Sequence, residues 1–223
     1  MPLSPPYQLE ILTENDIDAC FECAAPAFLH DALREATFPP HLVDPANPDE
    51  ELDFRKRRMR TRFEDGSIFF KILDPDQPGR IAAWSNWTPP QKPDATKKTS
   101  DAPDPNDRPK CVNHVVLDAQ MNFMKEAKER LFGDDKNFWY LGGLVTNPDY
   151  QGKGMGAALV RWGMEQAEMD GVPVYLEATP TGRILYTKLG FEKVDEFDVS
   201  KFLPDGKQYK MVCMIKRPGS KAQ

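Results

Sequence analysis

The sequence predicts an α/β protein with one mixed sheet of about seven strands flanked by helices. Three observations lead to this class. Short apolar or alternating segments recur along the chain, segments with helical periodicity separate most of them, and turns containing Pro or Gly separate others. The predicted strands are 7–12, 67–73, 80–88, 137–146, 172–178, 191–197 and 208–217.

The chain begins with a strand, a capped helix and a charged helix. In "TEND", Thr13 or Asp16 can accept a hydrogen bond from the first turn of a helix that we expect to run through Phe28. Over 48–65 acidic residues precede a run of Arg and Lys, so the helix complements its own dipole. We interpret the basic run as a solvated helix face rather than a nucleic-acid patch.

A hairpin and an insertion follow. The turn "DPDQPG" joins the strands 67–73 and 80–88, and it contains the Pro and Gly that turns favour. Residues 89–112 start with "PPQKPDATKKTSDAPDPNDRP", which lacks apolar residues. We therefore expect a flexible, protease-sensitive insertion that is dispensable for folding, within a single domain over 1–223. A helix of roughly 112–132 comes next.

Strands and helices then alternate up to the last two strands. The helical periodicity over 154–169 has Gly163 on its apolar face, which predicts a close approach of this helix to the sheet. In the short helix 179–190, Thr179 is the expected N-cap and Gly190 the expected C-terminal stop.

Composition and charge exclude several classes of protein. A chain of 223 residues with 40% hydrophobic content can bury a proper core, and a net charge of −6 argues against a nucleic-acid binder. Cys20 and Cys23 have no second Cys or His pair at zinc spacing, so we expect buried reduced thiols and no metal site. Without a leader-like start or an apolar run of membrane length, we expect a cytoplasmic protein that binds no membrane.

A glycine-rich stretch, "YQGKGMGAAL" (150–159), leads into the helix at 154–169. Gly152, Gly154 and Gly156 stand at every second position, although glycine is costly at a helix start unless something lies close to the backbone. Helix N-termini offer unpaired N–H groups and the positive end of a dipole, which suits a phosphate.

Three phosphate-binding patterns compete for this stretch. A P-loop needs Ser or Thr after Gly-Lys, but Gly154 follows Lys153. The dinucleotide fingerprint is matched literally, ending on Ala157, yet its first glycine must follow the strand directly and more strand–helix units must follow downstream. The pattern Gln/Arg-x-x-Gly-x-Gly/Ala is satisfied by Gln151, Gly154 and Gly156. The alternative is that the glycines only form a tight turn and bind no ligand.

Together with "ILYTKLGF" (184–191), this third pattern resembles the GCN5-related N-acetyltransferase (GNAT) superfamily, in which a tyrosine is followed by a Leu-Gly-Phe turn. The resemblance is close over 139–195 and is nearest to the puromycin-acetyltransferase-like branch and to fungal small-molecule members with a "YLEA" strand. It implies the GNAT fold, with a central mixed, mostly antiparallel sheet.

The resemblance also implies acetyl-CoA as co-substrate and no metal. The pyrophosphate would lie on main-chain N–H groups of the glycine turn, and an amide of the preceding strand would face the thioester carbonyl. Thr179 stands where relatives often have an asparagine that contacts the pantetheine arm. The implied cofactor-binding residues are Leu144, Val145 and Thr146 in the strand, Gln151, Gly152, Lys153, Gly154, Met155, Gly156 and Ala157 in the turn, and Thr179.

Acyl transfer to an amine needs a group that accepts a proton, because a primary amine with a pKa of about 10 is mostly protonated at neutral pH. The leaving sulfur departs more easily if an acid protonates it. Tyr186 occupies the position of the family's general-acid tyrosine, and the alternative is an aromatic residue that packs in the core.

The base is less clear from the sequence. Many relatives have a carboxylate on the strand before the turn, but here Gly142 and Gly143 supply no side chain. Glu177, in an otherwise apolar strand, is the best substitute. The alternative is that Glu177 is a structural partner of a nearby Arg or of a backbone amide. His30, His41 or an ordered water are the other candidates.

The acceptor site is expected to be shaped by 25–53, the loop 198–208 and the insertion. "AAPAFLHDALREATFPPHL" is apolar and aromatic rather than acidic, which favours a small-molecule amine over a basic peptide. We therefore expect an N-acetyltransferase that acts on a small amine by direct transfer, as a monomer or homodimer. The alternatives are a protein or peptide N-acetyltransferase and a non-catalytic acetyl-CoA-binding module.

Overall fold

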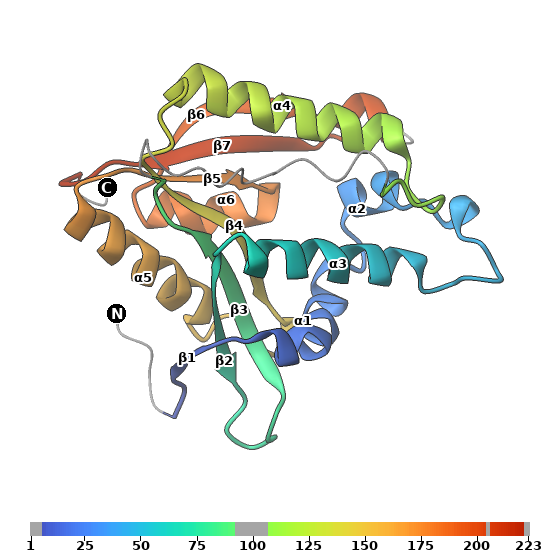
Figure 1. Cartoon of the computed structure of the whole chain (residues 1–223), viewed down its shortest axis with the longest axis horizontal. Helices are drawn as coiled ribbons and strands as arrows, with labels where there is room; N and C mark the ends of the chain where they lie inside the picture. The colour runs from blue at the N-terminus through green and yellow to red at the C-terminus, as the bar shows by residue number, and fades with distance from the viewer. Residues whose placement is uncertain (1–5, 92–106, 204–205, 221–223) are drawn as a thin grey trace.

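The computed structural model describes residues 6–91, 107–203 and 206–220. Its seven-stranded sheet has the order β1-β2-β3-β4-β5-β7-β6, and every neighbouring pair is antiparallel except β4 and β5 (Figure 1). The predicted fold class is confirmed. The strands are β1 Leu9–Ile11, β2 Ile68–Leu73, β3 Ile81–Thr88, β4 Trp139–Thr146, β5 Val174–Ala178, β6 Glu192–Asp198 and β7 Lys210–Lys216.

Five of the six helices in the described residues fall close to their predicted places, and the short helix Ala32–Thr37 was not predicted. The helices are α1 Ile17–Ala24, α2 Ala32–Thr37, α3 Glu50–Glu64, α4 His114–Phe132, α5 Met155–Asp170 and α6 Pro180–Lys188. The first helix is shorter than expected, because Pro26 has no N–H to continue it and the chain turns into a 3-10 segment, Pro26–Phe28. No helix in the described ranges is long and apolar enough to cross a membrane.

Helices cover both faces of the sheet. One face packs against α5 and α6, and the other packs against α1, α3 and α4. Because successive side chains of a strand point to opposite faces, Leu176 of β5 joins the α5–α6 cluster while Tyr175 packs with Ala127 of α4. This alternation decides on which face each candidate catalytic side chain lies.

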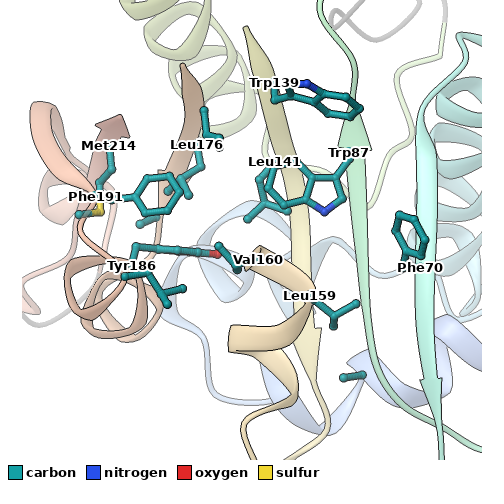
Figure 2. Packing of buried hydrophobic residues seen from close by; sticks show 14 of the residues in the cluster. Phe70, Trp87, Trp139, Leu141, Leu159, Val160, Leu176, Tyr186, Phe191 and Met214 are labelled. Atoms are coloured by element: carbon teal, nitrogen blue, oxygen red, sulfur yellow. The ribbon is translucent and has the colours of Figure 1, made fainter. Parts of the chain in front are cut away.

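The helix α5 lies directly on β3 because Gly163 has no side chain. An ideal Cβ at Gly163 would stand 2.3 Å from the ring of Trp87, which is fully buried. The rings of Trp87, Trp139 and Trp162 lie within 6.4 Å of one another, between centroids, at this contact. Figure 2 shows Trp87 projecting from β3 into the cluster that also contains Leu159 of α5. The close approach predicted from Gly163 is confirmed.

The insertion expected over 89–112 is only partly described, since 92–106 lie outside the described residues. Its C-terminal end is packed. Cys111 and Val112 are each 2% exposed, and the Cys111 N–H donates to the Glu50 carboxylate of α3 at 2.9 Å. The expected boundary at 112 is therefore too far along the chain, because these two apolar side chains are part of a core cluster.

We predict that Gly163→Ala destabilises the protein by about 1–3 kcal/mol, because the new methyl group overlaps the Trp87 ring and forces β3 or α5 to shift. This exceeds the gain that Gly→Ala gives in an unconstrained helix. Thermal unfolding is the measurement, with Tm falling by about 2–4 °C for each kcal/mol. Glu165→Ala, an exposed change on the same helix, is the control. An unchanged Tm for Gly163→Ala contradicts the contact.

Candidate active site

Two glycines of the turn before α5 have left-handed backbone conformations. Gly152 has φ 79° and Gly154 has φ 81°, and a Cβ at either position would meet nothing within 4 Å. Gly156 differs, because its Cβ would stand 3.3 Å from Leu185 and 3.5 Å from Thr146 Oγ1. The first two glycines therefore leave open space beside the backbone, and the third allows α5 to pack closely on β4 and α6.

Most amides of this turn have no hydrogen-bond partner among the described residues. Gln151 N donates to Pro148 O at 3.2 Å and Ala158 N donates to Gly154 O at 3.0 Å. Between them, the N–H groups of 152–157 make no hydrogen bond of normal geometry within the described ranges. They coincide with the positive end of the α5 dipole, which is an arrangement that binds an anion such as phosphate.

Tyr150 anchors the turn and holds two cations beside it. Its hydroxyl donates to the Asp74 carboxylate, and burial followed by this bond raises the pKa of Tyr150 to about 12, so the hydroxyl keeps its proton. Lys153 Nζ lies 4.9 Å from the centroid of the Tyr150 ring and the Arg80 guanidinium 5.4 Å from it. Lys153 therefore brings a positive side chain to the turn, whereas the Arg80 guanidinium is paired with Asp149 at 3.0 Å.

The strands β4 and β5 separate at this end of the sheet. Their parallel pairing ends at Leu141 and Leu176, although β4 continues to Thr146. Asn147 N donates to Ala82 O of β3 at 3.0 Å, and hydrogen-bonded pairs alternate along an antiparallel ladder. By this alternation the amides of Leu144 and Thr146 point away from β3, toward the gap beside β5.

The same alternation gives Val145, the third predicted strand residue, an amide that points the other way. The amide of Val145 is directed to its β3 partner Trp84, and its side chain packs with α1. Of the three residues predicted to face a thioester, Leu144 and Thr146 therefore present free backbone edges and Val145 does not. Gln151 Nε2 donates to the carbonyl of Thr146 at 3.4 Å and so connects the glycine turn to this edge.

A β-bulge lies where the two strands separate. Asn86 of β3 pairs with Gly143 and Trp87 pairs with Leu141, so Gly142 is the additional residue. A Cβ at Gly142 would stand 2.6 Å from Asn86 Oδ1. Gly142, one of the two glycines that deprive this strand of a carboxylate, thus has no room for a side chain while Asn86 keeps its position.

Glu177 lies on the face covered by α4. Its carboxylate accepts a hydrogen bond from the Tyr140 hydroxyl at 2.7 Å, and Lys128 Nζ stands 4.0 Å from it. Lys128 also lies 3.9 Å from the centroid of the Tyr140 ring. The Glu177 side chain is 4% exposed, so these partners stabilise its charge in a poorly solvated place. Both the structural partners and a position beside the strand gap are therefore present.

Tyr186 lies on the opposite face, in the cluster between α5, α6 and the sheet. Its ring extends toward Val160 and packs edge-on against Phe191, with centroids 5.7 Å apart (Figure 2). Burial raises the pKa of Tyr186, which keeps its hydroxyl protonated at neutral pH. Among the described residues this hydroxyl has no hydrogen-bond partner. Tyr186 and Glu177 do not lie together, since the sheet separates them.

Thr179 and the two histidines have simpler surroundings. Thr179 caps α6 as predicted, accepting from Gly182 N at 3.1 Å. His30, just before α2, and His41, in a 3-10 turn after it, are both exposed. They lack the burial of Glu177 and Tyr186.

Four polar residues near the gap were not predicted from the sequence: Arg62, Asn86, Lys128 and Tyr140. Arg62 and Lys128 look like ordinary charged residues of amphipathic helices, and Tyr140 lies in an apolar strand. Only the bulge and the strand order bring them together, so nothing in their local sequence indicates a site.

The fold and these groups place unpaired amides at the N-terminus of α5, beside the diverging ends of two parallel strands, which is an arrangement suited to an anion. Comparison with known proteins agrees with this arrangement. Residues 115–193 match the family model described as acetyltransferase (GNAT) domain. This part of the chain is therefore similar to the GNAT acetyltransferase domain, as its sequence motifs predicted.

Two curated relatives are fungal. A probable acyltransferase SID5 of Ajellomyces capsulatus is 49% identical over 82 residues, which are 34% of this chain and 58% of that protein. An acetyltransferase of Stachybotrys chartarum is 30% identical over 93 residues, 42% of this chain and 38% of that protein. The matches thus span less than two thirds of either relative.

Solved structures show the same fold at low sequence identity. Arylalkylamine N-acetyltransferase 2 from Aedes aegypti has a TM-score of 0.60 at 17% identity, covering 95% of this chain and 99% of that chain. The putative acetyltransferase YncA from Salmonella typhimurium, solved with its cofactor acetyl-CoA, has a TM-score of 0.54 at 15% identity, covering 97% and 96%.

We predict that Gly154→Val abolishes coenzyme A binding, because a β-branched side chain then occupies the open space beside the unpaired amides. The shift in Tm that coenzyme A gives to the unmodified protein disappears. Gly171→Val is the matched control: Gly171 has φ 68° at the other end of α5 and also has nothing within 4 Å of its Cβ position. It carries the same backbone strain but keeps the shift. A shift retained by Gly154→Val places the ligand elsewhere.

Proposed function

We propose that this protein is an acetyl-CoA-dependent N-acetyltransferase that transfers the acetyl group directly to the amine of a small molecule. The observation that carries the proposal is two sets of backbone amides without an acceptor in the described residues: the N–H groups of 152–157 in the glycine turn, and those of Leu144 and Thr146 at the strand gap. The hydrogen bond from Gln151 Nε2 to the carbonyl of Thr146 connects the two sets. The first set suits a pyrophosphate and the second suits a carbonyl oxygen that develops negative charge.

Acetyl-CoA, when bound, supplies an activated acetyl thioester. The chain's part is to bind its phosphates at the α5 N-terminus and to donate a hydrogen bond to the carbonyl oxygen from Leu144 or Thr146. Thr179, whose acceptor oxygen is used by the α6 cap, retains its hydroxyl proton for a bound group.

The two candidate proton-transfer groups suit opposite sides of one reacting carbon. Glu177, on the α4 face, accepts a proton from the incoming amine, and its ionised form is stabilised by Lys128 and Tyr140. Tyr186, on the α5–α6 face, donates a proton to the departing sulfur, since burial keeps its hydroxyl protonated.

Small amines are favoured over basic peptides as acceptors by the charge around the strand gap. Arg62 and Lys128 both reach this region, so a peptide rich in Lys or Arg meets like charge. One structural relative is named as an arylalkylamine N-acetyltransferase, which is consistent with a small-molecule acceptor. A panel of amines run beside histone and N-terminal peptides, with acetyl-CoA, separates the two classes.

Release of free coenzyme A can be followed with a thiol reagent, because we expect the protein's own buried thiols not to react with it. All four cysteines are buried and free. Burial raises the pKa of Cys23 to about 12, and that of Cys111 and Cys213 to about 11. The reagent needs an accessible thiolate, which these groups do not present.

We predict that Tyr186→Phe lowers kcat by roughly 10²-fold with little effect on acetyl-CoA affinity, because only the proton donor is lost while the ring still packs. Tyr175→Phe is the control: it removes another buried hydroxyl, one bonded to Cys213, and leaves kcat unchanged. If kcat of Tyr186→Phe equals that of the control, the residue is a core aromatic only.

We predict that Glu177→Gln lowers turnover near neutral pH and recovers part of it as the pH rises. The amide still accepts from Tyr140 but takes no proton, whereas the free amine becomes abundant without help as the pH approaches the amine pKa of about 10. Asp195→Asn, which removes an ion-paired carboxylate at the edge strand β6, keeps the profile of the unmodified protein. A wild-type profile for Glu177→Gln assigns the base to water or to a histidine.

A further inference from the structure

We propose that the acceptor carries a carboxylate in addition to its amine, and that Arg62 binds this carboxylate beside the Asn86 amide on the α3–α4 face of the sheet. The inference rests on the proposed function and narrows its substrate class to amino carboxylic acids.

Arg62 lies at the strand gap, and no described acidic residue pairs with it. It comes from the last turn of α3, and its Nη1 donates to Asn86 Oδ1 at 3.2 Å and to Gly142 O at 3.3 Å. Both acceptors are neutral. Within the described part of the chain no carboxylate lies within 4.0 Å of this guanidinium, and its Nε and Nη2 groups donate to nothing.

Other cations of the same helix are paired. Arg55 binds Glu51 at 3.2 Å, Lys56 binds Asp18 at 2.6 Å and Arg57 binds Asp107 at 2.7 Å. Arg62 differs from them in pointing into the sheet at the bulge. A guanidinium with a free edge of N–H donors matches a carboxylate in a bidentate manner, which is the geometry that arginine favours.

Asn86 supplies a second, independent observation. It is 1% exposed, and its Nδ2 has no hydrogen-bond partner in the described residues. A buried amide donor without an acceptor is costly and rare in folded proteins. Because its Oδ1 is already bonded to Arg62, the pair presents an N–H donor and a cation side by side to an incoming anion.

Arg62 and Tyr140, the hydrogen-bond partner of the candidate base Glu177, both lie beside Gly142, which has no side chain. A Cβ at Gly142 would stand 3.4 Å from Arg62 Nη1 and 3.3 Å from Tyr140 Cε1, and the Tyr140 hydroxyl is bonded to Glu177. The charged groups that face this cluster from α3, α4 and β5 are Arg62, Lys128 and Glu177. Lys128 is engaged by Glu177 and Tyr140, which leaves Arg62 for an anion and Glu177 for an amine.

The test compares acceptors that differ only in the carboxylate. Phenylalanine and 5-aminopentanoate are assayed beside phenylalaninamide and 5-aminopentanamide, with acetyl-CoA and thiol detection. We expect kcat/KM to favour the carboxylates by at least about tenfold, as for a site whose polar groups are left unpaired by the wrong substrate. Arg62→Gln removes this preference by raising KM for the carboxylates alone, and leaves the carboxamides and the coenzyme A thermal shift unchanged.

Arg60→Gln, an exposed change on the same helix, is the control for general charge and keeps the preference. Equal losses for both acceptor types in Arg62→Gln, or no preference in the unmodified protein, overturn the inference while leaving the proposed function standing. If no amine is acetylated, the proposed function fails. Calorimetric binding of the same carboxylates to the coenzyme A-saturated protein then decides the inference: binding lost in Arg62→Gln supports it, and absence of binding overturns it.

Discussion

β4 and β5 run parallel in a sheet whose other neighbours are antiparallel, and they stop pairing after Leu141 and Leu176. Ligands of α/β proteins tend to bind at the carboxyl ends of such strands, where the backbone is not used by the sheet. The candidate site depends on this loss of pairing. It frees the amides of Leu144 and Thr146, and the bulge at Gly142 accompanies it. Glu177 of β5 lies on the face covered by α4, whereas Tyr186 of α6 lies on the opposite face of the sheet.

The position of the glycine turn depends on how α5 packs on the sheet. The helix is fixed to β3 through Gly163 against Trp87 and to β4 through Gly156, so its N-terminus is held beside the free edge of β4. Gln151 and Tyr150 then fix the turn itself, one to Thr146 and the other to Asp74. A phosphate site built from backbone amides requires such support, since its donors cannot adjust separately as side chains do.

The sequence was sufficient for features that local physics decides. The order of the strands and of five helices, the Thr179 cap and the close approach at Gly163 follow from periodicity, capping and glycine, and the structure confirms them. The short helix α2 was not predicted. The end of the first helix and the boundary of the insertion were wrong, because Pro26 ends the helix early and Cys111 is packed in the core. The partners of Glu177 come from β4 and α4, and Arg62 comes from α3. These neighbours are set by strand order and register, which no local pattern encodes.

The packing of α5 on the sheet also has an optical consequence. Three of the four tryptophans, Trp87, Trp139 and Trp162, meet at this contact, whereas the Trp84 indole donates to the Cys20 carbonyl on the opposite face. Most of the chain's indole chromophores are therefore concentrated at the helix that carries the glycine turn. Their emission and near-ultraviolet dichroism are an intrinsic signal for the position of that helix, available without a label.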